Sequence, residues 1–414
     1  MRARQVTRLR KVAYVLCTGC PESRIDSARV QSFLEENGWN VTSDLKEADL
    51  ILFRACGLTE KTADESLQII RRVKAEKNGS AEFIVWGCLP KIDPEALRTE
   101  YKGVTFGEKE VAILNKILEA KKPIEEIVAN YVMPVFEPER SGLYGCLYKL
   151  HDFAEKHLSI VQSESIFRIK VSTGCLGNCS FCAIRKSRGV VRSKSIDSVL
   201  SEFRHGLDKG FRYFGLLATD LGAYGRDLGY SLVDLLVELT KEKGDYKIGL
   251  RNVNPYHLNE MFEELIPIFS SGKIWFLSSA IESASNRILK LMRRRYKIQD
   301  FKKCIQILNK EHPSILLKTQ LMVGFPTETE EDFQKSLRFL DELKFDWVEI
   351  YKFSLRCGTL AAKITGQVPN KIKEARFRRL TLKTVVQRPH KKVKQILQSY
   401  LKSYCERQDW TPST

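Results

Sequence analysis

The sequence lacks any long apolar segment. None of its apolar runs approaches the roughly 18 consecutive residues of a membrane-spanning helix. Residues 1–11 are basic, but the apolar run that follows, 12–17, is too short for the core of a secretory signal. We therefore expect a cytoplasmic protein without membrane contact. Disulfides are rare in that reducing compartment, so the 11 cysteines are expected to bind metal or to take part in catalysis.

Acidic residues are also in short supply. The 414 residues include 68 Lys and Arg against 51 Asp and Glu, a net charge of +17. With 43% hydrophobic and 29% charged residues, the composition is typical of globular protein, and the length suggests two or three domains. The positive charge favours an anionic partner, most commonly nucleic acid. It is equally compatible with a basic surface that only keeps the protein soluble.

Three similar units follow one another in residues 11–100. In each unit a short apolar stretch leads to a cysteine (Cys20, Cys56 or Cys88) and then to a helical pattern. Such units predict β–α repeats with a buried, mostly parallel sheet, whose functional crevice lies at the carboxyl ends of the strands. A lone cysteine would be read as a small buried hydrophobe. Three at repeated strand ends predict one shared site.

A second series of apolar stretches begins near residue 167. Its expected strands are 167–171, 213–217, 247–250, 274–277, 316–323 and 347–353, separated by helix-compatible segments such as 195–209, 232–243 and 330–343. Six alternating units predict a parallel β/α barrel that stays partial, since a closed one usually has eight.

The remaining chain is expected to be a basic helix. Residues 365–414 hold 12 Lys or Arg against 3 Asp or Glu, and Pro389 is expected to break or kink the helix. The predicted fold is thus α/β, with a parallel-sheet domain in 1–135, a connection in 136–164, a partial barrel in 165–364 and a helical tail in 365–414.

One segment concentrates cysteine directly after a predicted strand. Cys175, Cys179 and Cys182 have C-x3-C-x2-C spacing, and Gly174 and Gly177 allow the tight backbone that brings thiolates together. A 4Fe–4S cluster has four irons, so three thiolates leave one iron open for a cofactor or substrate. A structural zinc ion is the alternative, but it needs a fourth ligand, and no histidine lies between residues 157 and 205.

This motif, with Phe181 before its last cysteine, resembles the signature of the radical S-adenosylmethionine (SAM) superfamily. The resemblance implies that SAM chelates the open iron and is cleaved to a 5′-deoxyadenosyl radical. It also implies an electron donor similar to flavodoxin or ferredoxin. Segments 217–227, 251–255, 291–296 and 323–328 look like further landmarks of this family. By resemblance, the cofactor contacts are Phe181, Asp220 or Thr219 (for the amino group), Arg251, Glu282 and Gly324.

The three N-terminal cysteine loops look like those of the methylthiotransferase family, and the resemblance extends over residues 12–364. It implies a second 4Fe–4S cluster on Cys20, Cys56 and Cys88 that carries sulfur, and a second SAM that supplies a methyl group. The implied reaction replaces C–H by C–SCH3. Cys17 is close enough to compete with Cys20, but it falls within the predicted strand and lacks a preceding glycine. Cys146, Cys304, Cys357 and Cys405 are predicted to be ordinary residues.

The sequence departs from this family in places. No alternating strands are predicted after residue 365, where the family usually has an RNA-gripping β-barrel. Glu282 replaces an amide, Ala280 a proline, Ala284 a glycine and Cys357 a proline, so an altered substrate pocket is expected.

Three functions stay open. The first is methylthiotransfer to a tRNA adenosine, with the basic tail in place of the barrel, and the net charge of +17 favours it. The second is the same chemistry on a peptide or small metabolite. The third is a non-catalytic iron–sulfur protein, against which the intact landmarks argue. The N-terminal loops resemble members that modify a ribosomal-protein aspartate, whereas the barrel resembles members that modify tRNA.

Overall fold

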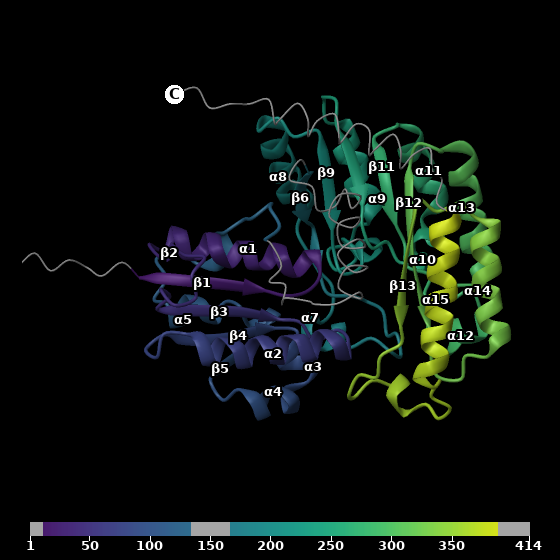
Figure 1. Cartoon of the computed structure of the whole chain (residues 1–414). Helices are drawn as coiled ribbons and strands as arrows, with labels where there is room; N and C mark the ends of the chain where they lie inside the picture. The colour runs from purple at the N-terminus through teal and green to yellow at the C-terminus, as the bar shows by residue number, and fades with distance from the viewer. Residues whose placement is uncertain (1–10, 134–165, 388–414) are drawn as a thin grey trace, which may run out of the picture.

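The computed structural model describes residues 11–133 and 166–387. They form two parallel sheets with helices around each, and the carboxyl ends of the first sheet lie against the second (Figure 1). No helix in these two ranges is long and apolar enough to cross a membrane. The expected α/β class is confirmed.

The first sheet has five parallel strands in the order β2-β1-β3-β4-β5. The three predicted strands are β1 (Val12–Cys17), β3 (Leu50–Ala55) and β4 (Glu82–Gly87), while the edge strands β2 (Asn40–Val41) and β5 (Val104–Gly107) were not predicted. The strand order reverses between β1 and β3, and in open α/β sheets ligands bind beyond the carboxyl ends at such a reversal. Cys20 and Cys56 follow these two strands.

Helices cover both faces of this sheet (Figure 1). On one side lie α1 (Pro21–Glu36) and α5 (Ile113–Ile117), and on the other α2 (Glu60–Glu76) and α4 (Pro94–Glu100), with the short α3 (Leu89–Ile92) after β4. All six residues of β3 are buried, which explains its nearly continuous apolar sequence. Arg54 is the one charged residue in it.

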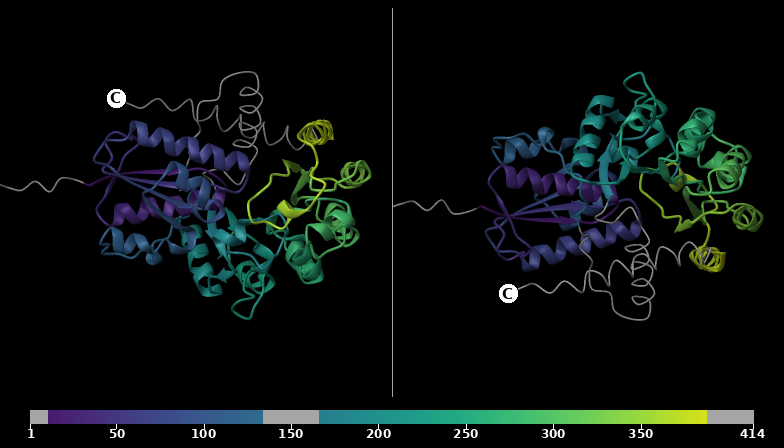
Figure 2. Two further views of the ribbon diagram at one scale, coloured as in Figure 1. Left: turned by 90° about the horizontal axis from the view of Figure 1, so that it is seen from below. Right: turned by 90° about the horizontal axis from the view of Figure 1, so that it is seen from above.

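The second sheet has six parallel strands whose spatial order follows the sequence. They are β6 (Ile166–Lys170), β9 (Tyr213–Leu217), β10 (Lys247–Leu250), β11 (Ile274–Ser278), β12 (Leu316–Val323) and β13 (Trp347–Lys352). Its helices form an outer arc (Figure 2): α8 (Ile196–Asp208), α9 (Leu232–Lys241), α10 (Pro255–Glu260), α11 (Phe262–Ser270), α12 (Asn286–Leu291), α13 (Ile298–Glu311) and α14 (Glu330–Glu342). This is the partial barrel that the sequence predicts.

Helix α15 (Asn370–Gln387) packs against β13 and α14 instead of standing free. Leu380 is fully buried, and Arg376, Arg379 and Lys383 form ion pairs with acidic residues of the barrel. Three cations of the described part of the predicted basic tail are therefore paired with the barrel. The rest of that tail, with Pro389 and Cys405, lies outside the described residues, as do the predicted connection and Cys146.

Candidate active site

The C-x3-C-x2-C loop is held between two short strands. It leaves β7 (Ser172–Thr173), enters α7 (Ile184–Arg188) and returns through β8 (Arg192–Ser193), which pairs with β7. Gly174 has a φ of +87°, and a Cβ there would lie 2.1 Å from the carbonyl oxygen of Val190. Gly177 is needed for another reason, because its N–H donates to Cys175 Sγ (3.1 Å) and a Cβ would crowd that sulfur. Both glycines let the backbone bend around the sulfurs.

Asp220 lies beside the first cysteine of this loop. It is 3% exposed, and its Oδ2 is 3.7 Å from Cys175 Sγ and 3.6 Å from His257 Nε2. Its Oδ1 is buried without a hydrogen-bond partner in the described chain. A buried carboxylate oxygen without a partner is costly, so an ammonium group placed here would be well bound. This geometry fits the amino group of SAM.

A buried ion pair lies beside the other two cysteines. Arg294 Nη2 is 2.6 Å from Glu282 Oε1, and the guanidinium stands 5.9 Å from the ring centroid of Phe181. Burial alone would lower the pKa of Arg294, but the nearby Cys179, Glu282 and Cys182 hold that pKa above its usual value. The predicted cofactor contact Glu282 is thus brought close to the cysteine loop, which itself contains Phe181.

Thr219 and Asp220 point in opposite directions, as successive residues of extended chain do. The Thr219 hydroxyl faces the first sheet, where it contacts Arg188 and Glu22 at 3.1 Å each. Of the two residues predicted as alternatives for the SAM amino group, only Asp220 faces Cys175.

The last two predicted contacts lie on other strands of the barrel. Arg251 follows β10, and its Nη1 is buried without a hydrogen-bond partner in the described chain. Gly324 follows β12 with a φ of +76°, and a Cβ there would lie 2.3 Å from Lys373 Cγ of α15. The packing against α15 therefore already requires glycine at this position.

The three N-terminal cysteines converge as predicted. Cys20, Cys56 and Cys88 follow β1, β3 and β4, which are neighbours in the sheet. A Cβ on Gly19 would lie 3.3 Å from Cys56 Sγ, so the Cys20 loop touches Cys56. Burial and the neighbouring Cys88 and Cys20 together raise the pKa of Cys56 to about 12. Thiols of this kind must lose their protons when they bind metal.

The three cysteines follow three neighbouring strands of the first sheet. Neighbouring strands are roughly 4.8 Å apart, and in a cubic cluster each thiolate caps its own iron. Among the described residues, no three His, Cys, Asp or Glu side chains are close enough together to hold one metal ion. Cys17, by contrast, is the last residue of β1 and is 1% exposed in the core.

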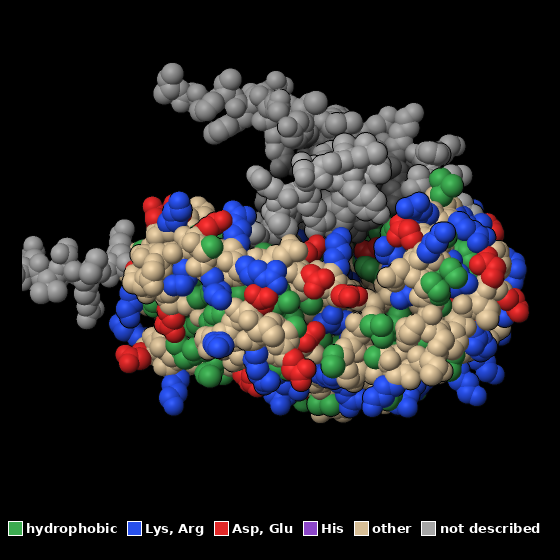
Figure 3. Space-filling view, turned by 60° about the horizontal axis from the view of Figure 1, so that its bottom comes forward, with side chains coloured by type: hydrophobic (Ala, Val, Ile, Leu, Met, Phe, Trp, Pro, Cys, Tyr) green, Lys and Arg blue, Asp and Glu red, His purple; other side chains and the backbone are tan. Residues whose placement is uncertain are grey.

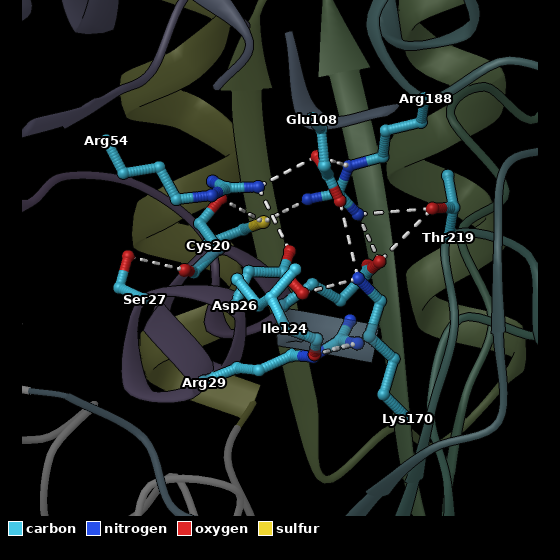
Figure 4. A network of polar contacts seen from close by, with 12 residues as sticks. Cys20, Asp26, Ser27, Arg29, Arg54, Glu108, Ile124, Lys170, Arg188 and Thr219 are labelled. Carbon is cyan, nitrogen blue, oxygen red and sulfur yellow. Dashed lines mark hydrogen bonds and ion pairs between the residues drawn. The ribbon is translucent and has the colours of Figure 1, made fainter. Parts of the chain in front are cut away.

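A buried network of charges joins the two sheets beside these cysteines (Figure 4). From the first sheet, Arg54 pairs with Asp26 (3.1 Å) and Glu108 (2.8 Å). From the second, Lys170 pairs with Asp26 (2.6 Å), and Arg188 Nε lies 3.1 Å from Glu108. Burial alone would raise the pKa of Glu108, but the three cations hold it well below its ordinary value.

Arg188 contacts residues on both sides of the boundary between the two sheets. It is 4% exposed, donates from Nη2 to Cys20 Sγ (3.5 Å) and from Nη1 to Thr219, and forms an ion pair with Glu22. Burial raises the pKa of the Cys88 thiol, while Arg188 and Arg54 act to lower it. Nε and Nη1 of Arg54 have no hydrogen-bond partner in the described chain. Cations with spare donors beside thiols fit an anionic iron–sulfur cluster.

The sequence analysis did not single out this network. A signal in the sequence was the charge of Arg54 inside an otherwise apolar strand and of Lys170 at the end of another strand, since a buried charge needs a partner. Nothing comparable marks Arg188.

Comparison with known proteins agrees with this geometry. Residues 169–340 match the Radical SAM superfamily, and residues 12–107 match the uncharacterized protein family UPF0004. A probable threonylcarbamoyladenosine tRNA methylthiotransferase of Archaeoglobus fulgidus is 31% identical over 369 residues, which cover 88% of this chain and 81% of the relative. This chain belongs to the radical SAM methylthiotransferase family.

Other members of the family act on protein. The ribosomal protein uS12 methylthiotransferase RimO of Protochlamydia amoebophila is 30% identical over 387 residues, covering 91% of this chain and 77% of that one. Among solved structures, the radical SAM methyltransferase TsrM of Kitasatospora setae shares the fold, with a TM-score of 0.57, 13% identity and coverage of 86% and 77% of the two chains. As a radical SAM methylthiotransferase, the protein is an enzyme whose superfamily implies a 4Fe–4S cluster and SAM.

Proposed function

We propose that this enzyme replaces a C–H bond of a tRNA adenosine by C–SCH3. The observation that carries the proposal is the pair of three-cysteine sites, one at the carboxyl ends of the first sheet and one on the loop after β6. Arg188, buried at 4% exposure, touches Cys20 of the first site and Thr219 beside the second. Sulfur insertion needs a radical source and a sulfur source within reach of one substrate carbon, and two adjacent sites supply that arrangement.

In this proposal Cys175, Cys179 and Cys182 hold the cluster to which SAM binds. When bound, the cofactor and its cluster supply the radical that removes hydrogen from the substrate carbon. The free, buried Oδ1 of Asp220 accepts the SAM amino group. Arg294 and Glu282 form a buried ion pair beside Cys179 and Cys182.

Cys20, Cys56 and Cys88 hold the auxiliary cluster, which serves as the sulfur carrier, and a second SAM supplies the methyl group. Arg188 and Arg54 offset the negative charge of this cluster from the side of the buried network. Cys20 is the least buried of the three, so the open side of the site lies next to it.

The acceptor is proposed from charge. One relative is named for tRNA and is 31% identical, and another is named for a ribosomal protein and is 30% identical. Sequence identity therefore does not decide between the two acceptors. The net charge of +17 favours a polyanion, because phosphate contacts dominate nucleic-acid affinity. A protein side chain is the alternative acceptor. We place the reaction in the cytoplasm, with electrons from a flavodoxin- or ferredoxin-like protein.

A competition between acceptors tests this proposal. Anaerobically reconstituted enzyme would be given a reductant and SAM with an isotopically labelled methyl group, together with total tRNA and ribosomal proteins. We expect the label in adenosines of the digested tRNA. Label confined to protein would contradict the tRNA acceptor and favour the alternative, and label in neither would contradict methylthiotransfer to both classes.

A further inference from the structure

A basic hollow of about 530 Å³ opens beside the C-x3-C-x2-C loop. Asn178 of that loop lines it together with Lys290, Arg293, Arg295 and Lys297, and Arg294 lies among them. These four cations, excluding Arg294, are called the basic pocket below. They occupy the end of α12 and the turn that leads to α13.

Hydrogen bonds fix this turn to the cysteine loop. The Ser180 N–H donates to the carbonyl oxygen of Met292 (3.0 Å), and the Ser180 hydroxyl donates to that of Leu291 (2.8 Å). Arg294 also lines the hollow, and its charge interacts with Cys179 and Cys182. A ligand held in the basic pocket is thus held at a fixed position relative to the radical site.

The four cations of the basic pocket lack counter-charges. Within residues 11–133 and 166–387 they make no ion pair, and all four are exposed. Several nearby cations of the barrel are paired instead: Arg376, Arg379 and Lys383 of α15 pair with Glu328, Glu330 and Asp341, and Arg294 pairs with Glu282. Figure 3 shows Lys and Arg mixed with Asp and Glu across one face of the protein. The basic pocket differs from that mixed surface because it gathers four cations within residues 290–297, none of which has an ion-pair partner in the described part of the chain.

We propose that the basic pocket binds backbone phosphates of the RNA acceptor next to the nucleoside that is modified. The inference rests on the proposed tRNA acceptor. Several like charges on one turn suit a polyanion with repeated phosphates, and the Asn178 amide adds a hydrogen-bond donor. Phosphate contacts set the register of a nucleic acid without reading its bases. Here they would fix which nucleoside reaches the radical site.

The test compares two charge-matched variants of the full-length, cluster-loaded protein. The pocket variant carries Lys290→Gln, Arg293→Gln and Arg295→Gln. The control variant carries Arg212→Gln, Lys241→Gln and Lys243→Gln, which remove the same charge just before β9 and at the end of α9, away from the cysteine loop. Each protein is titrated with total tRNA at several salt concentrations, with iron content and thermal unfolding as checks on folding.

We expect the pocket variant to bind tRNA about tenfold or more weakly at low salt. The slope of the logarithm of the binding constant against the logarithm of salt concentration should become shallower by about 2. Each phosphate that the variant no longer neutralises accounts for roughly 0.7–0.9 of that change. The control variant should bind like the wild type. If both variants bind tRNA equally weakly, or if neither binds more weakly than the wild type, the basic pocket is not a phosphate site. The proposed tRNA acceptor would stand in either case. If the wild-type protein does not bind tRNA, the proposed tRNA acceptor itself is contradicted. The basic pocket then has no RNA ligand.

Discussion

Arg188 Nη2 donates to Cys20 Sγ over 3.5 Å, across the boundary between the two sheets. The same guanidinium pairs with Glu22 and Glu108 and contacts Thr219. Each of the two cysteine sites is built on its own sheet, so their mutual position depends on contacts of this kind. Removing one partner of a buried ion pair usually costs more than the pair contributes, because the other charge is left buried and unpaired.

The first prediction concerns Arg188→Gln. We expect the free energy of unfolding to fall by about 3–5 kcal/mol, because Glu22 and Glu108 lose a buried partner. The reduction potential of the N-terminal cluster should become more negative, because a cation that donates to a cluster thiolate stabilises the reduced form. Urea unfolding and an EPR-monitored redox titration would measure the two effects.

Arg376→Gln is the matched control for that prediction. It removes an equally buried arginine, paired with Glu328 on the barrel. It should lower stability similarly without moving the potential of the N-terminal cluster. Arg188→Lys keeps a cation at this position, so it should bring the reduction potential part of the way back to the wild-type value. An unchanged potential in Arg188→Gln would show that this arginine is only structural.

Much of this arrangement could be predicted from the sequence. Short apolar runs identified nine strands, since parallel strands covered on both faces are continuously apolar. The two edge strands of the first sheet were not predicted because neither is a continuous apolar run. Strand β2 is only two residues long, and Val104 and Thr105 of β5 are exposed. The cysteines were found because a cluster needs several thiolates at fixed spacing. The network of Arg54, Glu108 and Arg188 was missed because its partners are far apart in sequence, and only tertiary structure pairs them.

The second prediction concerns cluster number. Two separate sites of three cysteines should bind about eight irons and eight sulfides after anaerobic reconstitution, four of each per cluster. Replacing Cys175, Cys179 and Cys182 together by Ala should leave about half. Iron and sulfide analysis of both proteins decides this, and an unchanged iron content would show that the ligands are wrongly assigned.

The third prediction concerns Gly174→Ala. An alanine Cβ would lie 2.1 Å from the carbonyl oxygen of Val190, so the cysteine loop must move and the cluster there should be lost. Gly210→Ala is the control, because Gly210 also has a positive φ (+81°) but open space around its Cβ position. That variant should lose about 1–3 kcal/mol of stability and keep its iron. Equal iron in both variants would contradict the close packing at Gly174.

The fourth prediction concerns Glu349, which pairs with Lys318 in the barrel. Burial alone would raise its pKa, but Lys318 and the hydroxyl of Tyr351 lower that pKa to about 2. A carboxylate with a lowered pKa stabilises the fold above its unfolded pKa of roughly 4.3, and this contribution is lost as pH falls through its folded pKa. Stability of the cluster-free chain should therefore decline between about pH 4.5 and pH 2 through this group.

Lys318→Met should remove that dependence. Glu349 would then lose its ion-pair partner, so its pKa should rise from its present value, and stability at pH 7 should fall by about 3–5 kcal/mol. The control, Lys335→Met, breaks only the exposed pair with Glu331 and should cost about 0–1 kcal/mol. Urea unfolding at several pH values measures both. If the Lys318 variant declines with acid as steeply as the wild type, Glu349 does not carry the effect.

The central claim is that one site generates the radical and the other supplies sulfur. Mass spectrometry of one reaction with tRNA and SAM tests it, by following 5′-deoxyadenosine and an adenosine heavier by one sulfur and one CH2 unit. We predict both products from the wild type and from the buried-core control Cys17→Ala, only 5′-deoxyadenosine from Cys56→Ala, and neither from Cys179→Ala. Undiminished methylthio-adenosine from Cys56→Ala, or its absence from a wild type that cleaves SAM, would contradict the account.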